Sequence, residues 1–324
     1  MKTTISILIL VFLMSDSSDC QENKKVTPEQ QRKLEHLKKE VTENLTGNIL
    51  SYWSAKMVDN VNGGFYGRID RNDKVYPDAE KGGILNARIL WTYSSAYRVL
   101  GDTSYLRMAT RARDYILNHF IDSQYGGAFR SLKADGKPSD TRKQLYTNAF
   151  FIYGLSEYSR ATGDKKALEE ARKIFDLFEK YATDREYNGY FEAFSREWVR
   201  VRERMIGESS DKDEKTMNTS LHIMEAYANL YRVSGDKIVG DRLRNLVEIF
   251  LGKIIDKKTS HLICFLDRSW NSTSTVDSYG HDIESSWLLY EAASLLKDNN
   301  LTERVKKAGI KIAIAAEEGY QPDG

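Results

Sequence analysis

The chain has 324 residues, with 48 Lys and Arg against 47 Asp and Glu, and its formal net charge is +1. This balance excludes a global positive field that would draw the protein to nucleic acid or to anionic lipid. The length suffices for one large core or two ordinary domains, and its two cysteines, Cys20 and Cys264, form neither a disulfide framework nor a metal-ligand spacing.

The first predicted element is a signal peptide at residues 1–20. This segment has a basic start, continues with the apolar run from Ile5 to Met14 and ends in small polar residues. The apolar run is too short to span a bilayer as a stable helix. We therefore expect an exported protein, periplasmic or anchored by a lipid on Cys20, and the alternative is a cytoplasmic protein.

Three copies of one pattern follow in chain order, and each copy contains a Gly-Asp pair. Gly101, Gly163 and Gly235 begin these pairs, at spacings of 62 and 72 residues. In each copy a helix is predicted to end at the glycine, which adopts the left-handed conformation, and the aspartate is predicted to cap a second helix. A short aromatic segment with Asn-Gly or Gly-Gly predicts a tight turn. These turn segments begin at Asn62, Tyr125 and Asn188.

The predicted helices are of two kinds. Residues 104–120 and 165–181 carry one apolar stripe and one charged face, as outer helices do. Four other stretches are apolar nearly all round, namely residues 83–100, 145–161, 218–233 and 281–296. Helix pairs of this length must stack to bury their apolar faces, and units of more than 60 residues favour a closed ring over a solenoid.

We therefore predict an all-α fold, an (α/α)6 barrel that is a toroid of helix hairpins with the apolar helices inside. No linker rich in Pro, Gly or Ser divides the chain, so residues 21–324 are expected to form a single domain.

Polar residues interrupt the apolar helices on narrow stripes. In residues 218–233 these residues fall within about 60° of one another on the helix surface. If such helices form an inner wall, the stripes converge on one cavity, which is typical of a small-molecule site. The stripes consist of Asn218, His222, Glu225 and Asn229; of Arg88, Thr92 and Ser95; and of His281, Glu284 and Ser285, while Tyr146 lies at the start of a further inner helix.

Two non-catalytic interpretations of these residues are open. In the structural one, His222 is a hydrogen-bonded core histidine, Arg88 pairs with a carboxylate such as Glu225 or Glu284, and Glu284 is favoured by the helix dipole. In the metal one, two His-x-x-Glu stretches supply two histidines and two glutamates, enough for zinc or iron. The order is the reverse of the bundle motif, however, and Arg88 would repel a cation.

The catalytic interpretation uses the same residues as a proton-transfer set. A histidine takes and returns a proton near neutral pH, and a carboxylate one turn away would fix its tautomer. Arg88 would stabilise an oxyanion such as an enediolate. The coincidence of three stripes on inner helices favours the catalytic interpretation over the two non-catalytic ones.

Three segments of the chain resemble the cellobiose 2-epimerase group of the N-acylglucosamine 2-epimerase superfamily of (α/α)6 barrels. They are residues 86–98, 215–232 and 278–293, and the resemblance extends from Glu29 to the last residue. It implies reversible epimerisation at C2 of a reducing-end sugar, such as cellobiose to glucosyl-mannose, with no cofactor. The expected partner is a small disaccharide, not nucleic acid or a membrane beyond an N-terminal anchor, and the protein is expected to be a monomer.

The resemblance also implies roles for individual residues. His281 resembles the general base and acid at C2, and Glu284 its carboxylate partner. His222 and Arg88 resemble the residues that hydrogen-bond the O1/O2 region of the sugar and stabilise the cis-enediolate. Asn218 and Tyr146 resemble substrate contacts.

The chain departs from the family pattern at its C-terminus. The family places a second catalytic histidine and stacking tryptophans on a late helix, whereas the last histidine here is His281. We therefore expect a barrel that lacks its last hairpins, and a 324-residue chain with little or no epimerase activity that folds poorly or aggregates.

Other functions fit the same residues less well. Within the superfamily the alternatives are an N-acylglucosamine or a mannose 2-epimerase. A glycoside hydrolase on the same toroid would need two acidic groups about 5–9.5 Å apart, whereas the stripes carry histidines. A non-catalytic glycan-binding toroid is the remaining alternative.

Overall fold

The computed structural model describes residues 26–201 and 213–321. The chain divides into two compact units, Met1–Val58 and Asp59–Gly324, and each is described by itself. The sequence carries no linker signal at this boundary, and the single domain expected for residues 21–324 stays a prediction. The predicted signal peptide and the lipidation of Cys20 lie outside the described residues. In the part of the chain that is described, none of the helices has the length and apolar character needed to cross a membrane.

The described part of the first unit is helical. Helix α2 (Pro28–Glu43) begins with a capping box, in which Thr27 and Gln30 exchange side-chain and backbone hydrogen bonds. The helix continues through a π-helical segment, Asn44–Leu50, into α3 (Ser51–Lys56).

The second unit is built from successive helix hairpins, as predicted. The first helices of the hairpins are α4 (Gly83–Leu100), α6 (Leu145–Thr162), α8 (Met217–Ser234) and α10 (Tyr279–Leu295). The second helices are α5 (Thr103–Tyr115), α7 (Lys165–Leu177), α9 (Lys237–Ile249) and α11 (Asn299–Ala316). Helices α5, α7 and α9 end in π-helical turns, Ile116–Phe120, Phe178–Ala182 and Phe250–Ile254, and α11 in a 3-10 turn, Glu317–Gly319.

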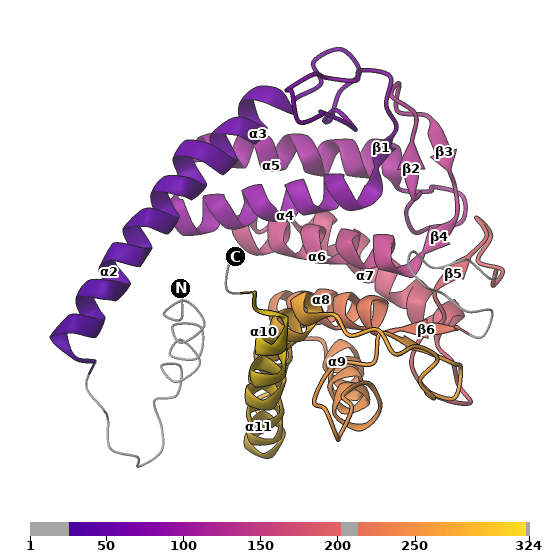
Figure 1. The fold of residues 1–324 in the computed structure, drawn as a ribbon. Coiled ribbons are helices and arrows are strands. Elements are labelled where there is room, and N and C mark those ends of the chain that lie inside the picture. The colour runs from indigo at the N-terminus through magenta and orange to yellow at the C-terminus, as the bar shows by residue number, and fades with distance from the viewer. Residues whose placement is uncertain (1–25, 202–212, 322–324) are drawn as a thin grey trace. The chain divides into compact units, whose positions relative to one another are not determined.

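The first helices of the hairpins pack side by side in chain order, α4 on α6, α6 on α8 and α8 on α10 (Figure 1). Each also packs on the second helix of its own hairpin. Helices α6 and α8 are buried along most of their length, whereas α7 buries only one stripe. This confirms the mostly helical class, and the sorting into buried and amphipathic helices for α6, α7 and α8. Helix α10, also predicted to be apolar nearly all round, instead buries one stripe and leaves Trp287 39% exposed.

The Gly-Asp pairs end and begin helices as predicted. Gly101, Gly163 and Gly235 have positive φ angles of 76°, 77° and 62° at the C-termini of α4, α6 and α8. The aspartate that follows each glycine accepts a hydrogen bond from a backbone N–H in the first turn of α5, α7 or α9. The boundaries of these hairpins are therefore set locally, by residues adjacent in sequence.

Short antiparallel strands connect neighbouring hairpins just before the buried helices begin (Figure 1). Strand β1 (Lys81–Gly82) pairs with β2 (Ser131–Leu132), and β2 pairs with β3 (Pro138–Asp140). Strand β4 (Lys143–Gln144) pairs with β5 (Ala193–Phe194), and β6 (Lys215–Thr216) pairs with β7 (Phe265–Leu266). Because β1, β4 and β6 run directly into α4, α6 and α8, these pairings fix the N-terminal ends of the three helices.

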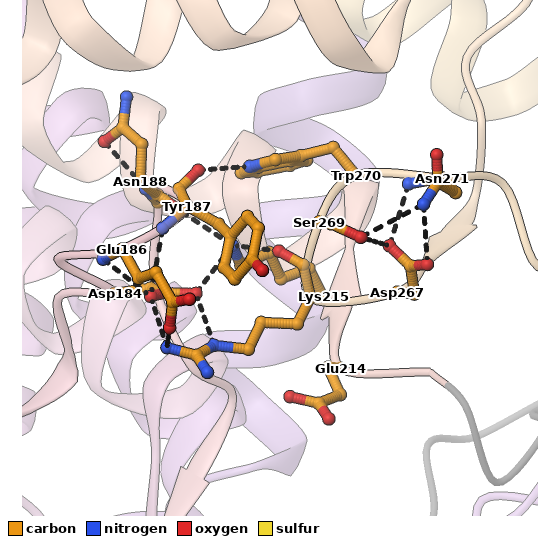
Figure 2. Close-up of polar contacts among 12 residues, drawn as sticks. Asp184, Glu186, Tyr187, Asn188, Glu214, Lys215, Asp267, Ser269, Trp270 and Asn271 are labelled. Carbon is orange, nitrogen blue, oxygen red and sulfur yellow. Dashed lines mark hydrogen bonds and ion pairs between the residues drawn. The ribbon is translucent and has the colours of Figure 1, made fainter.

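Each of these three strands begins with a buried lysine. The lysine forms an ion pair with the aspartate that opens a preceding glycine turn. The Nζ–Oδ2 distances are 2.7 Å for Lys81–Asp59, 2.9 Å for Lys143–Asp122 and 3.0 Å for Lys215–Asp184. The third ion pair, Lys215–Asp184, belongs to a larger polar cluster. In this third cluster the Nε1 atom of Trp270 also donates a hydrogen bond of 2.7 Å to the carbonyl of Tyr187 (Figure 2).

The tryptophan of the third cluster explains one of the turn glycines. Gly189 has a φ of +79°, and a Cβ atom there would lie 2.5 Å from Cζ2 of Trp270. Gly163 has a similar φ of +77°, but a Cβ atom there would meet nothing within 4 Å. The two positions thus share the backbone requirement and differ in the space around the Cβ atom.

We expect Gly189→Ala to destabilise the protein more than the matched control Gly163→Ala. Both variants place a side chain in the left-handed region, which costs about 1–2 kcal/mol. Only Gly189→Ala forces the Trp270 ring to move, and overpacking of this kind costs about 1–3 kcal/mol more. Thermal unfolding of the two variants measures the difference, and equal losses of stability would contradict this explanation.

Candidate active site

Two of the predicted site residues, Arg88 and His222, lie at equivalent positions on the buried helices α4 and α8. Arg88 on α4, Phe150 on α6 and His222 on α8 each follow the strand lysine of their own hairpin by seven residues. The strands fix where these helices start. Residues that follow the strand lysines by the same number of positions therefore lie at the same level of neighbouring helices. Phe150 was not among the predicted site residues, since a phenylalanine on a buried helix looks like core.

The side chains at this level contact one another. The guanidinium carbon of Arg88 lies 4.4 Å from the centroid of the Phe150 ring. The ring of His222 lies 4.9 Å from that of Phe150 and 5.1 Å from that of Tyr146, in an edge-on arrangement with the latter. Nη2 of Arg88 and the Tyr146 hydroxyl are 3.5 Å apart. The structure therefore brings together Arg88, Tyr146 and His222, three residues predicted from separate helices.

The electrostatics of Tyr146 link this cluster to α10. Burial is the largest effect on its pKa and raises it, Arg88 lowers it, and the charges of Glu284 and Glu225 raise it, with a net increase. The phenol therefore stays protonated at neutral pH and can donate a hydrogen bond. The charge of Glu284, a residue of α10, thus acts on the pKa of Tyr146.

His222 has a carboxylate partner on its own helix. Its Nδ1 atom lies 2.8 Å from Oε2 of Glu225, three residues further along α8. The two side chains are only 4% and 10% exposed. The sequence placed both residues on one polar stripe, but it assigned the histidine–carboxylate pairing to His281 and Glu284 instead.

The expected bond between His281 and Glu284 is not present among the described residues. Nδ1 of His281 lies 2.6 Å from the hydroxyl of Ser278, the residue just before α10. The i, i+3 spacing brings two residues to one helix face, but the imidazole is in the first turn, where the preceding serine reaches it first. Ser278 therefore replaces Glu284 as the hydrogen-bond partner of His281.

The start of α10 is held by a second histidine that the sequence analysis missed. Nδ1 of His261 lies 2.7 Å from Oδ2 of Asp282, and the backbone N–H of Leu262 donates to Oδ1 of the same residue at 2.9 Å. Burial lowers the pKa of His261, but the hydrogen bond and charge of Asp282 outweigh it, so the pKa is raised. Asp282 directly follows His281, so this buried pair fixes the turn that carries the predicted base.

Asn218 completes the predicted set. It lies in the first turn of α8, one turn before His222. Its Oδ1 atom is buried and has no hydrogen-bond partner within residues 26–201 and 213–321. A buried acceptor without a partner is costly, so this atom is available to a ligand hydroxyl.

The arrangement does not gather the donors that the metal interpretation required. Within the described ranges, no group of three or more His, Cys, Asp or Glu side chains is positioned to hold a metal ion. His222 is instead bonded to Glu225, and His281 to Ser278.

Comparison with known proteins gives a consistent result. The family model for N-acylglucosamine 2-epimerase matches residues 64–324. The chain is 51% identical to the cellobiose 2-epimerase of Bacteroides fragilis, over 90% of this chain and 74% of the relative. It is 41% identical to that of Ruminococcus albus, over 86% of this chain and 72% of the relative.

A solved structure of a cellobiose 2-epimerase matches a similar share of this chain. The cellobiose 2-epimerase from Bacillus thermoamylovorans superimposes with a TM-score of 0.85 and 38% identity, over 88% of this chain and 72% of that one. The helix hairpins and the matched sequence thus agree with each other. The chain belongs to the N-acylglucosamine 2-epimerase family, and within that family it groups with the cellobiose 2-epimerases.

Proposed function

We propose that this protein epimerises C2 of the reducing-end sugar of cellobiose, giving glucosyl-mannose, and that Arg88, Tyr146, His222 and His281 act on that sugar. The observation that carries the proposal is the contact of Arg88, Tyr146 and His222 across three adjacent helices. The similarity to cellobiose 2-epimerases over 90% of the chain supports the choice of sugar.

The proposal includes the ring architecture expected from the sequence. Helices α4, α6, α8 and α10 would form part of the inner wall of an (α/α)6 barrel, with their second helices outside. The order of packing supports this assignment, because each buried helix neighbours the next buried helix and its own partner.

The first chemical step is removal of the C2 proton of the open-chain sugar by His281. The electron pair of the C2–H bond forms the C1–C2 double bond of a cis-enediolate, and the former carbonyl oxygen O1 takes the negative charge. Ser278 orients the imidazole through Nδ1, which leaves Nε2 for the C2 proton. General base catalysis of this kind contributes about 10²–10⁴-fold in rate.

The remaining residues of the cluster stabilise the enediolate. Arg88 donates hydrogen bonds to O1, where negative charge develops, and so acts mainly in the transition state. His222 hydrogen-bonds the O1/O2 region, Tyr146 donates from its protonated hydroxyl, and Asn218 accepts from a sugar hydroxyl with Oδ1. Glu284 contributes its charge near Tyr146 rather than a bond to His281.

Inversion at C2 is complete when a proton is returned to the opposite face of the enediolate. Abstraction and stabilisation need only the residues named above, whereas inversion needs a second acid on the other side. Exchange of the C2 proton with solvent therefore reports on this cluster more directly than the yield of epimer does.

The proposal is tested by incubating the full chain in deuterated water with cellobiose, N-acetylglucosamine or mannose in separate reactions. Proton NMR follows loss of the C2 signal in each sugar, and product analysis follows the epimer. We expect deuterium to enter C2 of cellobiose fastest. Faster exchange in N-acetylglucosamine or mannose would overturn the choice of substrate. Release of glucose without exchange at C2 would favour a hydrolase, and binding of cellobiose without any exchange would favour a glycan-binding protein.

A further inference from the structure

His222 is the first member of a chain of contacts that crosses three buried helices. Glu225, on the same helix, contacts Nδ1 of the imidazole at 2.8 Å. The Glu225 carboxylate, through its charge and its hydrogen bonding, also raises the pKa of the Tyr153 phenol on α6. The ring of Tyr153 stacks on that of Trp91 on α4, with 5.1 Å between centroids and 15° between planes. None of these three residues has a role in the proton transfer proposed above.

The carboxylate of Glu225 decides which nitrogen of His222 carries a proton. An ionised carboxylate only accepts hydrogen bonds, so the imidazole must donate from Nδ1. In the neutral ring Nε2 is then an acceptor, and it is the nitrogen left for a ligand. An acceptor at this place suits the O2 hydroxyl of the sugar, while Arg88 donates to the charged O1.

Tyr153 holds the carboxylate in place. Burial raises the pKa of its phenol, and the charge and hydrogen bond of Glu225 raise it further, so the hydroxyl remains a donor at neutral pH. Stacking on Trp91 and an edge contact with Phe150, at 6.5 Å between centroids, restrict the ring. A carboxylate that is 10% exposed and lies 2.8 Å from the imidazole has little freedom to turn away from it.

We propose that Glu225 and Tyr153 are positioning residues that lock His222 in the Nδ1–H tautomer, so that Nε2 accepts a hydrogen bond from the O2 hydroxyl of the sugar. The tautomer lock is independent of turnover, whereas its effect on C2 exchange rests on the proposed function. Replacing the groups that orient a metal-bound histidine typically changes activity about 10–100-fold, and we expect an effect of that order here.

The lock is tested by nitrogen NMR of the full chain labelled with ¹⁵N-histidine at alkaline pH. His222→Gln assigns the His222 signals, and His261, whose Nδ1 also faces a carboxylate, is an internal reference. We expect Nδ1 of His222 to be protonated in the wild type. In Glu225→Gln, whose amide can donate as well as accept, we expect the Nε2–H form to appear. An Nε2–H form in the wild type, or an unchanged Nδ1–H form in Glu225→Gln, would overturn the proposal.

The effect on the reaction is measured by C2 exchange of cellobiose. We expect kcat to fall about 10–100-fold in Glu225→Gln and less in Tyr153→Phe, with a smaller rise in KM, because the bond to O2 is made in the bound sugar and strengthens in the enediolate. Tyr158→Phe is the matched control, since it removes another hydroxyl of α6 that bonds Thr110 at 2.9 Å. It should leave kcat unchanged.

The two measurements separate the proposals. The expected tautomers without any C2 exchange in the wild type would overturn the proposed function and retain the lock. Exchange with an unchanged kcat in Glu225→Gln would overturn the positioning role while the proposed function stands.

Discussion

Replacing His281 with alanine is expected to abolish exchange of the C2 proton of cellobiose. The imidazole is the only group to which the proposal assigns this proton, and loss of a general base costs about 10²–10⁴-fold in rate. Nδ1 of His281 lies 2.6 Å from the Ser278 hydroxyl, so Nε2 is the nitrogen to which the proposal assigns the C2 proton. Proton NMR in deuterated water, with the C2 signal as readout, measures the loss.

His36→Ala is the matched control for this substitution. His36 is an exposed residue of α2, and its contact is an ion pair with Glu40 at 3.4 Å. The His36→Ala variant should exchange the C2 proton of cellobiose at the wild-type rate. Wild-type exchange in His281→Ala as well would show that another group removes the proton, and the assignment of the base would be wrong.

Asp184→Ala is expected to lower the free energy of unfolding more than Gly189→Ala, Gly163→Ala or Glu186→Ala. Lys215, only 1% exposed, donates to the carbonyls of Asn188 and Arg268 at 2.7 and 2.8 Å and pairs with the 0% exposed Asp184 at 3.0 Å. Arg268 also donates to Asp184, at 3.0 and 3.1 Å. Removing the carboxylate leaves a buried ammonium without its counter-charge, which costs about 3–5 kcal/mol. Urea unfolding measures the change.

Two further variants show whether the buried charge is the cause. Glu186→Ala removes a 60% exposed carboxylate that also pairs with Arg268, at 2.9 Å, and should cost at most about 1 kcal/mol. Asp184→Ala combined with Lys215→Met should recover part of the stability, because it removes the uncompensated charge. An equal loss for Asp184→Ala and Glu186→Ala would contradict this account of the cluster.

The features that follow from neighbouring residues could be predicted from the sequence. A glycine after a helix and an aspartate after the glycine determine the hairpin boundaries at Gly101, Gly163 and Gly235, because capping involves only the next few residues. The separation of buried from amphipathic helices follows equally from periodicity.

The convergence of Arg88 and His222 could also be predicted, since equivalent positions in repeated hairpins lie at one level. The partner of His281 could not. Spacing alone does not decide between Glu284, three residues ahead, and Ser278, three residues behind, because the choice depends on the imidazole rotamer at the helix start.

The buried ion pairs leave no local signal in the sequence. Lys215 and Asp184 are 31 residues apart, as the difference of their numbers shows, and each resembles an ordinary surface residue. Only strand pairing and the glycine turn bring them together. The same holds for Tyr153 and Glu225, which belong to different helices.

The fate of the hydrogen at C2 tests the central claim most directly. Cellobiose labelled with deuterium at C2 of the reducing-end glucose is incubated with the full chain in ordinary water, and deuterium in the recovered sugar is measured by mass spectrometry and NMR. Removal of the C2 hydrogen by a solvent-exchanging histidine predicts that the label passes into water, at a rate that depends on His281. Complete retention of deuterium at C2 would contradict the account.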